Sequence, residues 1–108
     1  MADSRRETLA KELKESMGEV TWADLRRHLA RDVIIVVAPD LEILEAAIKI
    51  AENDQDQVDS WIKKGLLDKP GASQIEYWEK HLKLPFLMVV VQPFILIQIK
   101  AADGQGVN

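Results

Sequence analysis

The side chains best suited to binding chemistry cluster in one short segment, residues 26–31, with the sequence RRHLAR. Guanidinium groups bind phosphate and carboxylate groups through paired N–H donors, and an imidazole titrates near neutral pH. Arg27, His28 and Arg31 are therefore candidate residues for binding a small anion or an acidic partner surface. In the alternative interpretation, Arg31 only stabilises the C-terminal end of a helix, where positive charge is favoured.

Two further pairs have helical i, i+4 spacing. Asp24 and His28 could orient a general base or supply two metal ligands, but Asp24 also fits as a helix-capping acid. Tyr77 and His81 are best interpreted as a stacked pair on the surface. Neither pair predicts a catalytic site.

Several classes of site lack the residues they need. The sequence has no cysteine, which excludes disulfides, thiol nucleophiles and cysteine-based metal sites. It has no glycine-rich phosphate-binding motif, and no serine lies in a nucleophile elbow. Residues 54–59 begin like a calcium loop, but the sixth position is Asp59 where glycine is required. We therefore predict no cofactor, no metal and no catalytic residue.

The net charge and the hydropathy of the sequence argue against two classes of partner, nucleic acid and membrane. The net charge is −4, and residues 32–60 carry eight acidic residues against one lysine. This balance argues against nucleic acid as a partner. The longest apolar run, residues 84–91, is too short for a bilayer, which needs about 20 apolar residues. The charged N-terminus does not look like a secretory signal. We expect a cytoplasmic bacterial protein that binds neither nucleic acid nor membrane.

Apolar periodicity predicts about five helices. Capping boxes, in which a hydroxyl residue precedes an acid by three positions, indicate where several of them start. These pairs are Ser4 with Glu7, Thr21 with Asp24 and Ser73 with Glu76, and Asp54 with Gln57 is a looser version. The predicted helices cover residues 5–17, 22–30, 40–53 and 55–64, and a segment after Ser73 that carries Ile75, Trp78 and Leu82.

Tryptophans and β-branched runs mark the expected core. Trp22, Trp61 and Trp78 lie on apolar helical stripes, and Val58 and Ile62 are predicted to point inward with Trp61. Residues 33–37 form a continuous apolar run, which predicts a strand covered on both faces. Residues 86–91 and 94–99 are also predicted strands. Pro93 separates them, and either a hairpin or one kinked strand fits.

Together these elements predict one α+β domain, with a small sheet of two or three strands packed by about five helices. Residues 1–19 form an N-terminal helix, residues 20–99 the core domain and residues 100–108 a disordered tail. The helix at residues 40–53 is apolar around most of its circumference, so it must pack against the sheet and also against another helix or a second subunit.

This apolar excess favours a non-enzymatic protein-interaction or regulatory module, acting as a homodimer or with another protein. The alternative is a protein that binds a small anionic ligand, or a minor enzyme, using Arg27, His28 and Arg31.

Four segments resemble a family of short bacterial proteins of unknown function. They are residues 21–31 (TWADLRRHLAR), residues 38–41 (APDL), residues 52–55 with Trp61, and residues 89–98 (VVVQPFILIQ). The resemblance spans residues 20–99. Asp32 and Phe94 depart from the family pattern, where a small residue and a tryptophan are expected. The resemblance implies a domain of this size in a bacterial cytosol, and it implies no chemistry.

Overall fold

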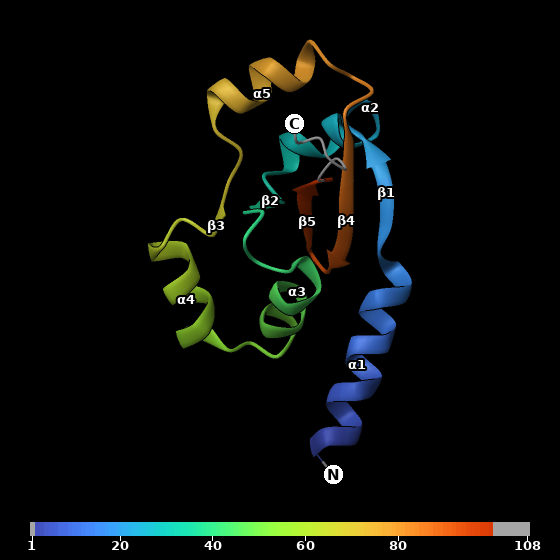
Figure 1. The fold of residues 1–108 in the computed structure, drawn as a ribbon, viewed down its shortest axis with the longest axis vertical. Coiled ribbons are helices and arrows are strands. Elements are labelled where there is room, and N and C mark those ends of the chain that lie inside the picture. The colour runs from blue at the N-terminus through green and yellow to red at the C-terminus, as the bar shows by residue number, and fades with distance from the viewer. Residues whose placement is uncertain (1, 101–108) are drawn as a thin grey trace.

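The computed structural model describes residues 2–100, and it describes side chains from Glu7 onward. Its helices are α1 (Ala2–Ser16), α2 (Trp22–Leu25), the 3₁₀ helix η1 (Arg26–Arg31), α3 (Ile43–Ala51), α4 (Gln55–Lys63) and α5 (Ala72–Glu79). Its strands are β1 (Gly18–Thr21), β2 (Ile34–Val37), β3 (Leu67–Asp68), β4 (Pro85–Val91) and β5 (Phe94–Ile99). These elements form one α+β domain (Figure 1).

The sheet is larger than the sequence predicts. Five strands lie in the order β1-β4-β5-β2-β3, so the prediction of two or three strands was wrong. The strands that were missed, β1 and β3, lie at the two edges. No apolar run marks either one, because each lies at an edge of the sheet and pairs along one side only, β1 with β4 and β3 with β2. The pairing of β3 with β2 ends at Asp68. Continuing the same register would place Pro70 opposite Ile34, and proline has no N–H to donate to the ladder.

The last two strands form a hairpin, which settles the question that the sequence left open. β4 and β5 pair antiparallel from Phe86 opposite Ile99 to Val91 opposite Phe94. Pro93 lies in the connection, where no ladder hydrogen bond is required of it. β5 then pairs with β2 in parallel, which makes it an interior strand.

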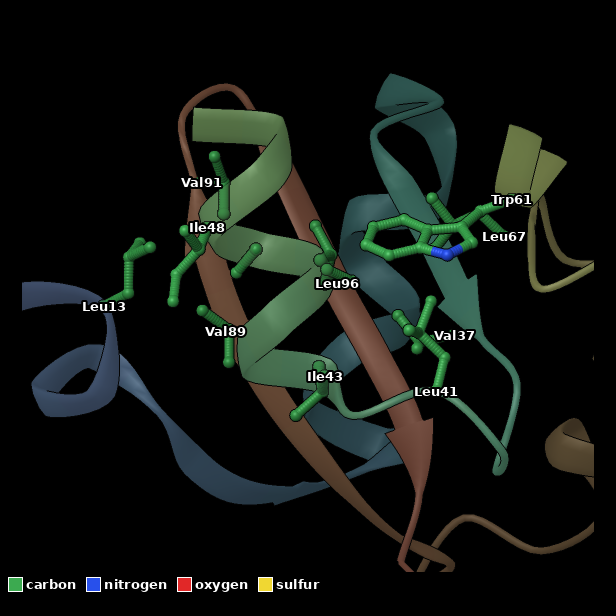
Figure 2. Packing of buried hydrophobic residues seen from close by; sticks show 12 residues of the cluster. Leu13, Val37, Leu41, Ile43, Ile48, Trp61, Leu67, Val89, Val91 and Leu96 are labelled. Atoms are coloured by element: carbon green, nitrogen blue, oxygen red, sulfur yellow. The ribbon is translucent and has the colours of Figure 1, made fainter. Parts of the chain in front are cut away.

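One face of the sheet packs against α1, α3 and α4. Ala46 and Ala47 of α3 are fully buried, and their small side chains bring this helix close to Val89 and Leu96 of the sheet. Figure 2 shows α3 lying over β4 and β5, with Leu13 of α1 beyond one side of the helix and Trp61 beyond the other. The mostly apolar helix is therefore covered by the sheet and by two other helices of the same chain.

The opposite face carries an aromatic cluster under α2, η1 and α5. Trp22 and Trp78 have ring centroids 4.9 Å apart, and Phe86 meets Trp78 edge-on at 5.1 Å. Ile34 packs in this cluster, whereas Val37 of the same strand packs on the other face. The prediction that this strand is covered on both faces is confirmed, as is the burial of all three tryptophans.

Several helix boundaries differ from those predicted. The expected helix at residues 22–30 is α2 followed by the 3₁₀ helix η1, whose tighter turns are common where a short helix leads into a connection. α5 begins two residues early: Gly71 is its N-cap, and the Gln74 side chain accepts from the Gly71 N–H at 2.8 Å. The predicted caps at Thr21 and Asp54 are present, since Asp24 accepts from the Thr21 N–H and Asp54 accepts from the Gln57 N–H.

Two predictions concern the ends of the chain: the start of the first helix and the C-terminal tail. α1 starts at Ala2, before the predicted cap at Ser4. The predicted tail lies outside the described residues except for Lys100, whose Nζ lies 3.2 Å from a carboxylate oxygen of Glu19. Within residues 2–100, no helix is long and apolar enough to cross a membrane.

Candidate functional site

The predicted basic cluster lies on η1. A 3₁₀ helix has three residues per turn, so side chains at i and i+3 eclipse one another. His28 and Arg31 therefore share one face, and Arg27 points about a third of a turn away. Arg27 and Arg31 are exposed and His28 is half-buried. The structure thus brings together two of the three candidate residues.

The cluster has few features of a formed binding site. Among residues 7–100, whose side chains are described, no salt bridge or side-chain hydrogen bond holds Arg27, His28 or Arg31 in place, and none of the three lines the hollows described below or the one beside Pro39. The cluster offers positive charge on an open surface, which attracts anions without fixing their orientation.

The neighbouring Arg26 belongs to an ordered network instead. Both Arg26 and the indole Nε1 of Trp22 donate to the carboxylate of Glu79, at the end of α5. The Trp22 bond is 2.7 Å long. The hydrogen bond from Trp22, together with that from Arg26, holds the pKa of Glu79 below its ordinary value. Because this network satisfies a buried indole and joins two helices, its role is structural.

The other spaced pairs are accounted for locally. Asp24 accepts hydrogen bonds from the backbone and hydroxyl of Thr21, so it caps α2. The rings of Tyr77 and His81 stack on the surface with centroids 4.1 Å apart, as predicted. Across the part of the chain that the structure describes, no group of three histidine or acidic side chains is arranged to hold a metal ion.

An apolar groove opens beside α4, and we call it the Phe94 groove. It encloses about 290 Å³. Two of its residues are large and exposed: Ile62 is 52% accessible and Phe94 is 37% accessible. Its lining is Ile35, Ile50, Val58, Ile62, Leu67, Asp68, Lys69 and Phe94.

A second hollow, of about 440 Å³, continues from the same helices. We call it the acidic hollow. It shares Ile50, Val58 and Ile62 with the Phe94 groove. Its remaining lining residues are all polar: Asn53, Asp54, Gln55, Asp56 and Asp59. The apolar and acidic surfaces therefore adjoin along one wall.

Sequence reasoning missed this surface because it predicted that Ile62 points inward with Trp61. The structure buries Trp61 and leaves Ile62 exposed. Since successive residues on a helix point about 100° apart, Trp61 and Ile62 cannot both point straight at the core. The signal available in the sequence was the adjacency of two large apolar residues on a nine-residue helix, α4.

The fold and the surface define a single-domain α+β protein with an open apolar groove. The chain belongs to the family described as "Protein of unknown function (DUF2288)", whose model matches residues 8–99. It is similar to the NMR solution structure of PA1075 from Pseudomonas aeruginosa, with 28% sequence identity and a TM-score of 0.75. That match covers 90% of this chain and 89% of the other. A comparison with curated proteins found no match.

Proposed function

We propose that this protein is a non-enzymatic interaction module that docks a segment of another protein in the Phe94 groove. One observation carries the proposal: Ile62 and Phe94 expose large apolar side chains on the same hollow. Fully burying such a side chain contributes about 1.5–3 kcal/mol. Apolar anchors that fill a pocket are the residues that dominate binding energy in protein interfaces.

The surface suits a side chain of a partner better than a free small molecule. Small-molecule sites have volumes of about 300–1,000 Å³ and enclose most of the ligand, with a few converging polar groups. The Phe94 groove is at the lower limit of that range, and two of its lining residues, Ile62 and Phe94, are exposed to solvent. A side chain of a partner protein can enter the Phe94 groove from the solvent side.

A homodimer is the competing proposal. It was favoured by the apolar circumference of the helix predicted at residues 40–53. The apolar circumference of α3 is covered by β4, β5, α1 and α4 of one chain. A symmetric dimer through the groove would also bring together two chains that each carry an acidic hollow beside it, and like charges near one interface oppose association. A partner protein is therefore the occupant that we propose.

Site-specific crosslinking tests this proposal. The photoreactive residue p-benzoylphenylalanine replaces Ile62 in the protein expressed in its own host cells. The control replaces Tyr77, which is 54% exposed and lines none of the described hollows. We expect an adduct with one distinct protein from position 62, lost in the Phe94→Ser background and absent from position 77. An adduct with a second copy would favour the homodimer, and no adduct from position 62 would overturn the proposal.

The alternative function is binding of a small anion on η1. It is supported by the shared face of His28 and Arg31, and by the lack of competing carboxylates bonded to them within the described residues. A thermal-shift titration with inorganic phosphate tests it. Saturating ligand would raise the melting temperature by several degrees. The rise would disappear in Arg31→Ala but remain in the control Lys64→Ala, and a flat titration would exclude this alternative.

The setting that goes with the proposed function is the cytoplasm of a bacterium. The similarity to a protein of Pseudomonas aeruginosa supports the bacterial part of that setting.

A further inference from the structure

We infer that the segment docked in the Phe94 groove is basic and amphipathic, with a large apolar residue in the groove and lysine or arginine over the acidic hollow. This inference rests on the proposed function and specifies the chemistry of its partner. It follows from the way in which the two hollows adjoin. Ile50, Val58 and Ile62 line both of them, so a chain anchored in one hollow has the other within reach.

The charge in the acidic hollow is one-sided. Asp54, Asp56 and Asp59 line it, and no lysine or arginine does. Two of these acids are already engaged in part. Asp54 accepts from the Gln57 N–H at 3.2 Å and lies 3.5 Å from Lys49, and Asp59 lies 3.2 Å from Lys63.

Asp56 is the acid with the greatest remaining capacity. It is exposed in the first turn of α4, and among the side chains described, those of residues 7–100, no salt bridge or hydrogen bond engages its carboxylate. A carboxylate at this position accepts charge-assisted hydrogen bonds from an incoming guanidinium or ammonium group. The hollow therefore complements positive charge, and it repels acidic peptides and anionic lipid surfaces.

The distance between anchor and cation follows from α4 itself. Asp56 and Ile62 are six residues apart on one helix, and at 1.5 Å per residue the axial separation is about 9 Å. A helical partner spans that distance in six or seven residues, which are two turns. Asp56 and Ile62 also point about 120° apart around α4, so a short amphipathic helix contacts both by placing its apolar anchor in the groove and extending the long side chain of a lysine or arginine to the hollow.

Synthetic peptides test the inference directly. Three fluorescein-labelled peptides of equal length are compared by fluorescence anisotropy: leucine with lysine at helical spacing, leucine with glutamate in the same pattern, and serine with lysine. We expect the leucine–lysine peptide to bind the full chain most tightly. The serine–lysine peptide controls for charge alone, and the leucine–glutamate peptide controls for the apolar face alone.

Protein variants locate the binding. Ile62→Ser and Phe94→Ser each remove an apolar wall, and each should weaken the leucine–lysine peptide by about tenfold or more. Asp56→Asn should weaken it several-fold and reduce its sensitivity to salt. Tyr77→Ser and Glu76→Gln are the matched controls, since both residues are exposed on α5 and line none of the described hollows. Equal urea midpoints for all variants would show that each one folds.

The outcomes separate this inference from the proposed function. If the leucine–glutamate peptide binds as well as the basic one and both respond to Ile62→Ser, the groove docks apolar segments and the inferred charge preference is wrong. If the basic peptide does not bind, or binds without response to Ile62→Ser and Phe94→Ser, the inference is overturned. Crosslinking from position 62 then decides the proposed function independently.

Discussion

The indole nitrogen of Trp22 donates a 2.7 Å hydrogen bond to the carboxylate of Glu79, 57 residues further along the chain. Trp22 is the first residue of α2 and Glu79 is the last residue of α5, so the bond fastens together two helices on the same face of the sheet. Trp22 is fully buried, and the one polar atom of its side chain is satisfied by the half-buried Glu79.

This bond makes part of the stability depend on pH. The pKa of Glu79 is held below its ordinary value, first by the hydrogen bond from Trp22 and then by the hydrogen bond from Arg26. The folded pKa is thus lower than the unfolded one. Ionised Glu79 therefore stabilises the fold above the unfolded pKa, and that stabilisation is lost as the pH falls through the folded pKa. We expect the urea midpoints of wild type and Glu79→Gln to differ most near neutral pH and to converge in acid.

The control for this titration is Glu76→Gln, which removes an exposed acid from the same helix but leaves the network with Trp22 intact. A difference between wild type and Glu79→Gln that stays constant from neutral pH to about pH 3 would contradict the linkage.

Gly18 and Gly65 both have room for a side chain, but only Gly65 has a positive φ, so substitutions at the two sites measure the cost of backbone strain without steric clash. A Cβ atom added at Gly18 or at Gly65 would meet nothing within 4 Å, but Gly65 has a φ of +77°, in the left-handed region. We expect Gly65→Ala to lower the free energy of unfolding by about 1–2 kcal/mol, the cost of a left-handed backbone for an L-residue. Gly18→Ala should leave it unchanged or raise it by up to about 1 kcal/mol. Urea unfolding measures both, and equal losses at the two sites would argue against this account.

Gln98 connects β5 with the segment that leads into α3. Its Nε2 donates to the carbonyl oxygens of Ala38 and Leu41, at 2.7 and 2.6 Å. Gln98→Glu puts a carboxylate oxygen where the donor was, facing two other acceptors, and should destabilise by about 1–3 kcal/mol. Faster amide hydrogen exchange over residues 38–42 would localise the effect. Gln92→Glu, at the exposed turn between β4 and β5, is the control, and a similar loss there would mean that added charge alone is responsible.

Leu96 is the test of core packing. It is fully buried on β5 beneath α3, as Figure 2 shows. Leu96→Ala should lower the free energy of unfolding by about 2–5 kcal/mol, through lost burial and the cavity left behind. Leu82→Ala makes the same chemical change at a residue that is 38% exposed, and should cost less than about 1 kcal/mol. Comparable values for the two variants would show that this layer repacks freely.

Much of the fold is predictable from local signals. The β-branched run at residues 33–37 predicts a strand covered on two faces, because such a strand has no polar alternation. Trp22 and Trp78 each lie on the apolar stripe of a predicted helix, and this position predicts their burial. The edge strands β1 and β3 are not predictable in this way, since their extended backbone depends on pairing with strands far along the chain.

The candidate site was harder to predict than the core. The sequence places Arg27, His28 and Arg31 together, but the change from an α-helix to a 3₁₀ helix turns Arg27 away from the other two. The Phe94 groove combines residues from β2, α3, α4, β3 and β5. No local periodicity describes such a surface, because it is created by the way in which separate elements end beside one another.

The strand order has a consequence for how the protein is made. β5 lies between β4 and β2, yet it is synthesised after every other strand. Roughly 60 residues separate β2 from β5, so translation at about 5–20 residues per second leaves β2 without its parallel partner for roughly 3–12 seconds. During that interval, the edge of β2 that will pair with β5 has no partner strand. With this strand order, β2 keeps an unpaired edge, the kind of edge that invites aggregation, until β5 is made.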